Sequence, residues 1–352
     1  MPRAAGLQTS IWNNNLRSLA LLALYPLIII GLIWVIAYIL SGLTMSPQFV
    51  RTDDMTGTTW TNVTNPEFFA NNVIAHYWPM ILGVVIIWFI ISYFWNTSMI
   101  RAMTHAHPVS RKDEPELYNM LENLSIAEGI PMPQLNIIET NALNAFASGI
   151  DRRSYTVTVT RGLMNTLAPD ELEAVIGHEL AHIINRDVRL LMICVIFTGM
   201  VGFAAQMAWH NVRYGMMYGG RQRGNQGGGL PIMLVITGVL WIGYLATLFT
   251  RFAVSRRREF MADAGAVQMT RNPEAMMRAL MRIAGRDRVP AMPADVAMMC
   301  IENRMPFMGL FATHPPIEKR IEALARLANT EVPKSLPPVQ RPANLPNNPW
   351  VR

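Results

Sequence analysis

The chain has 352 residues, of which 51% are hydrophobic and only 15% are charged. Soluble domains usually carry about 25% charged residues and disordered chains have low hydrophobicity, so the composition excludes disorder and indicates a membrane protein. The net charge is +6, and the two cysteines, Cys194 and Cys300, are too few for a disulfide framework. Arginines border long apolar runs, and no basic stripe alternates with aromatic residues. We therefore expect a lipid bilayer, and no nucleic acid, as a partner.

Four apolar runs are long enough to cross about 30 Å of hydrocarbon as helices. They cover residues 19–43, 77–95, 190–209 and 231–249. Basic residues flank the first pair on its outer sides, and the loop between them, residues 44–76, has no basic excess. We therefore expect both ends of this hairpin in the cytoplasm and its loop outside.

The connector of the second pair, residues 210–230, contains seven glycines and three arginines. Its positive charge is the wrong sign for an external loop. Two full spans are the working interpretation for this pair, and a re-entrant or interfacial hairpin is the alternative.

The apolar hairpins divide the chain into three parts. Residues 1–99 are expected to form an N-terminal transmembrane hairpin, and residues 100–330 one polar domain that the second hairpin interrupts at 190–250. The Pro-rich tail, residues 331–352, is expected to be extended or disordered. Periodicity and proline starts predict strands at 135–138 and 155–160, and helices at 114–128, from Pro169 onward, at 273–285 and at 316–328.

The strongest chemical signal is the run His178-Glu179-Leu180-Ala181-His182. Histidines at i and i+4 lie one turn apart on one helical face, so both imidazoles can reach one metal ion. Neutral nitrogen ligands suit zinc, and Glu179 lies beside that face, where it can act as a general base on water. The pattern predicts one Zn²⁺ ion per chain. An ordinary amphipathic helix with two histidines at this spacing is the alternative.

A catalytic zinc site needs a third protein ligand. The best candidate is Glu259, which follows the fourth apolar run, and Asp263 lies four residues later on the same helical face. Glu259 can bind the metal while Asp263 accepts a hydrogen bond from a ligating imidazole and fixes its tautomer. The alternative is a solvated charge cluster next to the membrane, formed with the neighbouring arginines.

Two further segments could serve a substrate. His314 and Arg320 lie where a helix is expected to begin, and a donor side chain near the metal would stabilise the oxyanion that hydrolysis creates. A helix-entry turn with exposed charges is the alternative. Asn144 and Phe146 precede the alternating strand, and a strand edge beside a metal site can bind an extended peptide. A plain loop leading into a core strand is the alternative there.

These motifs, in this order, resemble the HtpX family of membrane zinc metallopeptidases, which is related to the CAAX prenyl proteases. The resemblance covers about residues 15–330 and rests on residues 144–149, 178–187, 259–263 and 314–320. It implies that Glu179 is the general base, that Asp263 orients a ligating histidine, and that His314 and Arg320 contact the oxyanion or the substrate. The zinc ligands that it implies are His178, His182 and Glu259.

The resemblance also implies an activity. It describes a membrane-embedded, zinc-dependent endopeptidase of the gluzincin type that cleaves misfolded or damaged membrane proteins on the cytoplasmic side, in protein quality control and stress response. Protein or peptide substrates and a bacterial inner membrane are therefore expected. The expected fold is an α+β membrane protein: a mainly helical zincin-type metallopeptidase domain with a small β-sheet, plus about four transmembrane helices.

Three rival functions remain at this point. A CAAX-type prenyl protease would build its chamber from more spans than the four expected here. A zinc-stabilised membrane scaffold without turnover would lack a base beside the ligands. A transporter would carry ionisable or broken segments inside its spans.

Overall fold

The computed structural model describes residues 7–44, 49–54, 57–62, 65–218, 229–252, 257–284, 315–333 and 335–337. The chain forms two compact units. We call residues 1–16, 95–192 and 254–352 the polar unit, and residues 17–94 and 193–253 the membrane unit.

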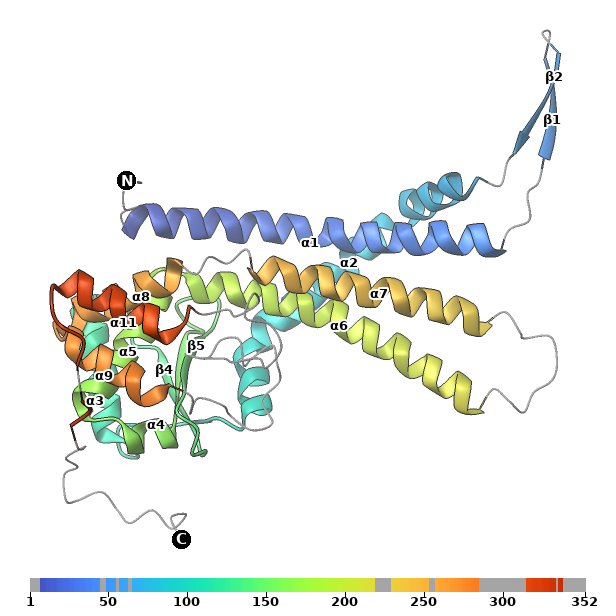
Figure 1. The fold of residues 1–352 in the computed structure, drawn as a ribbon. Helices are drawn as coiled ribbons and strands as arrows, with labels where there is room; N and C mark the ends of the chain where they lie inside the picture. Colours follow the sequence, from blue (N-terminus) through green and yellow to red (C-terminus); the bar gives the residue numbers. More distant parts are fainter. Residues whose placement is uncertain are drawn as a thin grey trace. The chain divides into compact units, whose positions relative to one another are not determined.

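Four helices among the described residues are long and apolar enough to cross a membrane, which confirms the four predicted runs. They are α1 (Leu7–Thr44), α2 (Pro66–Thr104), α6 (Asp187–Tyr218) and α7 (Gly229–Phe252) (Figure 1). Each helix extends past its apolar run because the polar flanks continue the backbone hydrogen bonding. Helix α2 begins with a proline, whose missing N–H costs nothing in the first turn of a helix.

The connection between α1 and α2 contains a hairpin that the sequence analysis did not predict. Strands β1 (Phe49–Asp54) and β2 (Gly57–Asn62) pair antiparallel, with Phe49 opposite Asn62. Both strands contain threonine, whose β-branched side chain favours extended backbone. The predicted loop is therefore partly regular structure.

In the membrane unit, aromatic and aliphatic side chains hold α1, α2 and α6 together. The rings of Tyr25 and Phe197 stack with their centroids 4.5 Å apart. Val85 and Ile193 complete this buried cluster. Rigid rings packed at this distance give the helices a defined contact in a setting where lipid surrounds them.

The polar unit contains a four-stranded sheet in the order β3-β4-β6-β5. Its strands are β3 (His107–Pro108), β4 (Gln134–Ile138), β5 (Ala145–Ser148) and β6 (Thr156–Thr160). Strands β4 and β6 are parallel, whereas β5 runs antiparallel to β6 and ends the order. The two predicted strands are thus confirmed as β4 and β6. The segment before the second of them is itself a strand, at an edge of the sheet.

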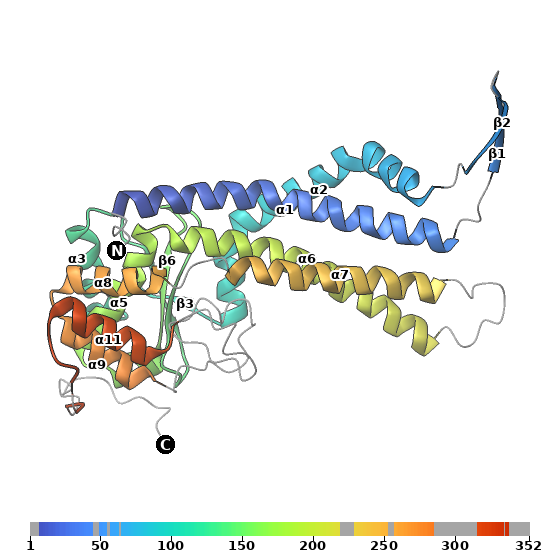
Figure 2. The same cartoon turned by 45° about the horizontal axis from the view of Figure 1, so that its top comes forward.

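Helices build the rest of the polar unit as far as the structure describes it. They are α3 (Pro115–Ala127), α4 (Arg161–Thr166), α5 (Pro169–Ile184), α8 (Arg257–Thr270), α9 (Pro273–Ile283) and α11 (Ile317–Ala328), and they confirm every predicted helix of this unit. Helix α5 contacts α3, α8, α9 and β5, while α9 and α11 lie side by side (Figure 2). A Cβ atom on Gly265 would lie 2.9 Å from the Cβ of Ala181, so glycine lets α8 approach α5 closely. This approach determines which side chains of the two helices can meet.

Candidate metal centre

Helix α5 presents His178 and His182 on one face, as the i, i+4 spacing predicts. Their Nε2 atoms lie 3.2 Å apart, and both side chains are buried. Asp170 and Glu171 lie in the first turn of α5, where negative charge favours the helix dipole. The local sequence therefore favours the helix, and the helical geometry places the two imidazoles on the same face.

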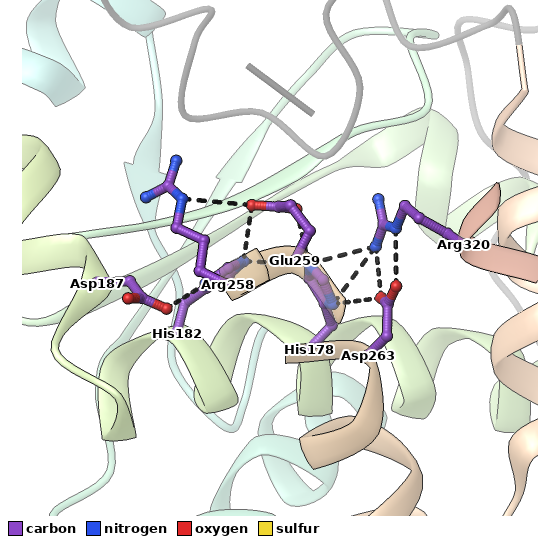
Figure 3. Close-up of polar contacts among 7 residues, drawn as sticks. All are labelled: His178, His182, Asp187, Arg258, Glu259, Asp263 and Arg320. Atoms are coloured by element: carbon purple, nitrogen blue, oxygen red, sulfur yellow. Dashed lines mark hydrogen bonds and ion pairs between the residues drawn. The ribbon is translucent and has the colours of Figure 1, made fainter. Parts of the chain in front are cut away.

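Helix α8 supplies the third donor group. Glu259 Oε2 lies 3.8 Å from His178 Nε2, and Glu259 Oε1 lies 3.7 Å from His182 Nε2 (Figure 3). The three ligand atoms all lie within 4.8 Å of one another. Donors at 2.0–2.1 Å from a tetrahedral zinc ion are about 3.4 Å apart, so two imidazole nitrogens and a carboxylate oxygen at these separations fit Zn²⁺.

Each imidazole is oriented by a carboxylate on its other nitrogen. His178 Nδ1 lies 2.9 Å from Asp263 Oδ1, the contact expected from the sequence. His182 Nδ1 lies 3.1 Å from Asp187 Oδ2. This contact of Asp187 with a candidate ligand was not predicted from the sequence. An acidic residue five positions after the second histidine was the signal available, but only the turn between α5 and α6 brings it back to the ring. Both contacts leave Nε2 directed toward Glu259.

Arg320 contacts the carboxylate that orients His178. Its Nε and Nη2 atoms donate to Asp263 at 2.9 and 2.6 Å, and the side chain is fully buried on α11. Nη2 is also 3.5 Å from the ring nitrogens of His178. The structure therefore places Arg320 next to the candidate ligands, while its contact with a substrate stays a prediction. His314 lies outside the described residues.

Glu179 projects beside the metal ligands and is almost completely buried. Burial raises its pKa to about 7, with the nearby charge of Glu259 as a further cause, while a hydrogen bond from the backbone of Ala147 in β5 opposes the rise. A carboxylate with a pKa near neutrality can both take up and release a proton at physiological pH. The structure thus brings the predicted base next to the edge strand.

The two candidate substrate residues, Asn144 just before that strand and Phe146 on it, are tied into the sheet. The Asn144 N–H donates to Thr160 Oγ1 at 2.9 Å, and the Phe146 side chain is 1% exposed. Phe146 therefore packs into the core, so a peptide would have to be recognised by the backbone of the strand. Their roles in substrate binding stay predictions.

The charges of the site suit a cation. Burial lowers the pKa of His178 to about 4, so this imidazole is neutral at pH 7. Burial alone would raise the pKa of Asp263, but the Arg320 guanidinium outweighs it and holds that pKa at about 2. Burial also acts to lower the pKa of His182, yet the Glu259 and Asp187 carboxylates raise it overall. The same carboxylates would attract a metal ion.

Known proteins are similar to this chain over most of its length. The family model described as peptidase family M48 matches residues 111–328, which include all of the residues at this centre. A Protease HtpX homolog of Bacteroides fragilis is 42% identical over 328 residues, which is 91% of this chain and 98% of the relative. The chain belongs to peptidase family M48. It is therefore an HtpX-type membrane metallopeptidase.

More distant relatives of this M48 peptidase cover less of its length. A Protease HtpX homolog of Trichormus variabilis is 39% identical over 251 residues, which is 70% of this chain and 85% of the relative. The crystal structure of S. mikatae Ste24p is 20% identical with a TM-score of 0.41, over 70% of this chain and 57% of that protein.

Proposed function

We propose that this M48 peptidase is a zinc-dependent endopeptidase with one Zn²⁺ ion per chain, held by His178, His182 and Glu259. The observation that carries the proposal is the convergence of their three donor atoms within 4.8 Å in a buried site. Asp263 and Asp187 orient the two histidines, and Arg320 keeps Asp263 ionised.

Glu179 is the proposed general base. When bound, zinc supplies the Lewis acidity that makes water nucleophilic near neutral pH and polarises the scissile carbonyl. Glu179 takes a proton from the attacking water and delivers it to the leaving amine, which balances the hydrolysis of the peptide bond. Its pKa of about 7 suits both transfers.

The edge strand β5 is the proposed binding surface for substrate. Ala147 contacts Glu179 through its backbone, so a peptide added along β5 would pass the base and the metal. In this role Asn144 and Phe146 position the strand. His314 and Arg320 are the proposed stabilisers of the oxyanion.

We further propose that the substrates are misfolded or damaged membrane proteins, cleaved on the cytoplasmic side of a bacterial inner membrane in quality control and stress response. Four candidate spans support a bilayer location, and the basic flanks of the first pair support a cytoplasmic site. The quality-control role is what the resemblance to the HtpX family implies.

The test is cleavage of an unfolded membrane protein by the full-length, detergent-purified chain with bound zinc measured in parallel. Glu179→Gln should lower turnover by about 100-fold to 10,000-fold because the base is lost, while one zinc per chain is retained. Glu173→Gln is the matched control, since it makes the same change on the same helix outside the site. This control should cleave as the wild type does.

Other outcomes would redirect the proposal. Cleavage of a prenylated peptide but not of unfolded membrane proteins would identify a CAAX-type activity. Full zinc occupancy with no cleavage of either substrate by the wild type would favour a scaffold. Equal activity of Glu179→Gln and wild type would remove Glu179 from the mechanism.

A further inference from the structure

Arg258 brings a positive charge to the candidate metal centre, and the proposed hydrolysis does not use it. It lies one residue before Glu259 on α8, and its Nε atom is 3.6 Å from Glu259 Oε1. The same oxygen lies 3.7 Å from His182 Nε2. The Arg258 side chain is only 11% exposed. A largely buried cation therefore stands next to a proposed metal ligand.

Two arginines near this centre differ in how their charge is balanced. Arg320 donates twice to Asp263, at 2.9 and 2.6 Å, so a carboxylate faces its guanidinium directly. Within the part of the chain that the structure describes, Arg258 forms an ion pair with Glu259 alone, and its buried Nε atom has no hydrogen-bond partner. Buried charges are normally paired and hydrogen-bonded, so Arg258 is the incompletely satisfied cation of the two.

Glu259, the counter-charge of Arg258, is also the proposed third ligand for zinc. Coordination would direct the negative charge of this carboxylate to the metal ion and away from the guanidinium. A cation beside a metal ion is electrostatically unfavourable, because like charges repel strongly at short distance in a buried site. An anion that arrives with the substrate would remove this repulsion.

The remaining donors of Arg258 point away from the metal ligands. Figure 3 shows both of its terminal nitrogens directed away from Glu259, while Arg320 lies on the other side of that carboxylate. Neither terminal nitrogen of Arg258 has a hydrogen-bond acceptor among the described residues. The N–H groups of a guanidinium match the two oxygens of a carboxylate. A peptide bound at the metal centre would bring such a carboxylate on an acidic side chain.

We propose that Arg258 binds an acidic side chain of the peptide substrate close to the scissile bond, and so selects for Asp or Glu at that position. The inference rests on the proposed peptidase function, because it needs a peptide at the metal centre. A site built around a charge rejects a substrate that lacks the opposite charge, since the buried guanidinium is then left without its partner. Arg258 is thus a specificity residue, and Glu179 keeps the transfer of protons.

The test uses two sets of short fluorescent peptides with both ends blocked. In one set a single Glu moves along an otherwise uncharged sequence, and in the matching set Gln takes its place. Binding to the full-length, zinc-loaded Glu179→Gln protein is measured by fluorescence anisotropy in uncharged detergent, because this parent protein lacks the base and leaves the peptides intact. The same ratio of Glu to Gln affinities is then measured after adding Arg258→Gln. Arg326→Gln is the matched control, since its side chain is 79% exposed on α11.

The Glu peptide that binds best should bind about tenfold more tightly than its Gln partner, and Arg258→Gln should reduce this ratio to about one. Arg258→Lys keeps the charge without the fork and should give an intermediate ratio, whereas Arg326→Gln should leave the ratio unchanged. A ratio near one in the parent protein, or an undiminished ratio in Arg258→Gln or Arg258→Lys, would overturn the proposal.

Two further measurements separate this proposal from its alternatives. Zinc per chain is determined for every variant, and an Arg258→Gln protein that loses zinc but keeps the ratio would show that the arginine only supports Glu259. Cleavage of the same peptides by the wild type is followed in parallel. A parent protein that prefers the Glu peptide, together with a wild type that cleaves neither set, would contradict the peptidase function and leave the carboxylate site standing.

Discussion

The polar unit and the membrane unit bury opposite kinds of side chain. In the polar unit, charged groups such as Glu171, Glu259 and Arg320 lie fully buried beside an apolar core. In the membrane unit, large apolar side chains face outward, with Leu27 62% exposed and Ile242 68% exposed. The solvent explains the difference, since water drives apolar groups inward while lipid does not.

The buried polar groups of the two units are satisfied in different ways. In the membrane unit, the buried hydroxyls of Thr237 and Thr247 donate to carbonyls of their own helix, each at 2.7 Å. In the polar unit, charges are paired between helices, as Glu171 on α5 is with Arg282 on α9 at 2.7 Å. Tertiary ion pairs therefore make the polar unit sensitive to single substitutions, and the membrane unit lacks this sensitivity at its lipid-facing positions.

The largest expected effect follows removal of a metal ligand in the polar unit. Glu259→Ala should lose bound zinc and reduce proteolysis to background, because two imidazoles alone cannot complete the site. Zinc per chain is measured by elemental analysis beside the cleavage rate, with Glu274→Ala on α9 as the control that keeps both. One zinc per chain in Glu259→Ala would contradict the assigned ligand set.

Loss of the buried arginine comes next. Arg320→Met should destabilise the polar unit by about 3–5 kcal/mol, because it leaves the Asp263 charge buried without its main partner. Chemical unfolding monitored by tryptophan fluorescence measures the effect. Adding Asp263→Asn to the same chain should restore part of the stability, since no uncompensated charge remains. If Arg320→Met is as stable as the wild type, and adding Asp263→Asn lowers its stability, this account is wrong.

A pair of leucine truncations tests the comparison between units directly. Leu280 is fully buried in the core of the polar unit, whereas Leu27 is 62% exposed on α1. Leu280→Ala should cost about 2–5 kcal/mol of unfolding free energy, and Leu27→Ala close to none, because lipid replaces the lost contacts. Both are measured by reversible unfolding in the same micelles. Equal losses would show that the outward leucine packs against protein.

The last expected effect is the pH dependence contributed by Glu179 in chelator-treated protein. Burial raises its pKa from 4.5 to about 7, so the folded state binds the proton more tightly than the unfolded state. Stability from this group is full below pH 4.5 and is lost as the pH rises through about 7. The melting temperature of the wild type should therefore fall relative to Glu179→Gln over this range. A constant difference between the two would mean that Glu179 ionises normally.

Much of the molecule could be predicted from the sequence alone. The four spans follow from apolar length, and α5 follows from its proline and acidic start, because these signals act within one helix. The spacing of His178 and His182 fixes their common face for the same reason. Glu259 is predicted as the third ligand only because His178 and His182 are present at metal-binding spacing. The structure brings the Glu259 carboxylate close to both imidazoles.

The tertiary structure alone decided which distant groups meet. Asp187 reaches His182 only because the chain turns between α5 and α6, and Arg320 reaches Asp263 only because α11 packs beside α8. The hairpin of β1 and β2 and the edge strand β5 likewise depend on pairing partners elsewhere in the chain. The spacing of residues within one segment determines which face of a helix or strand a side chain occupies. Which residue it meets across that face depends on tertiary packing, and no single segment specifies that packing.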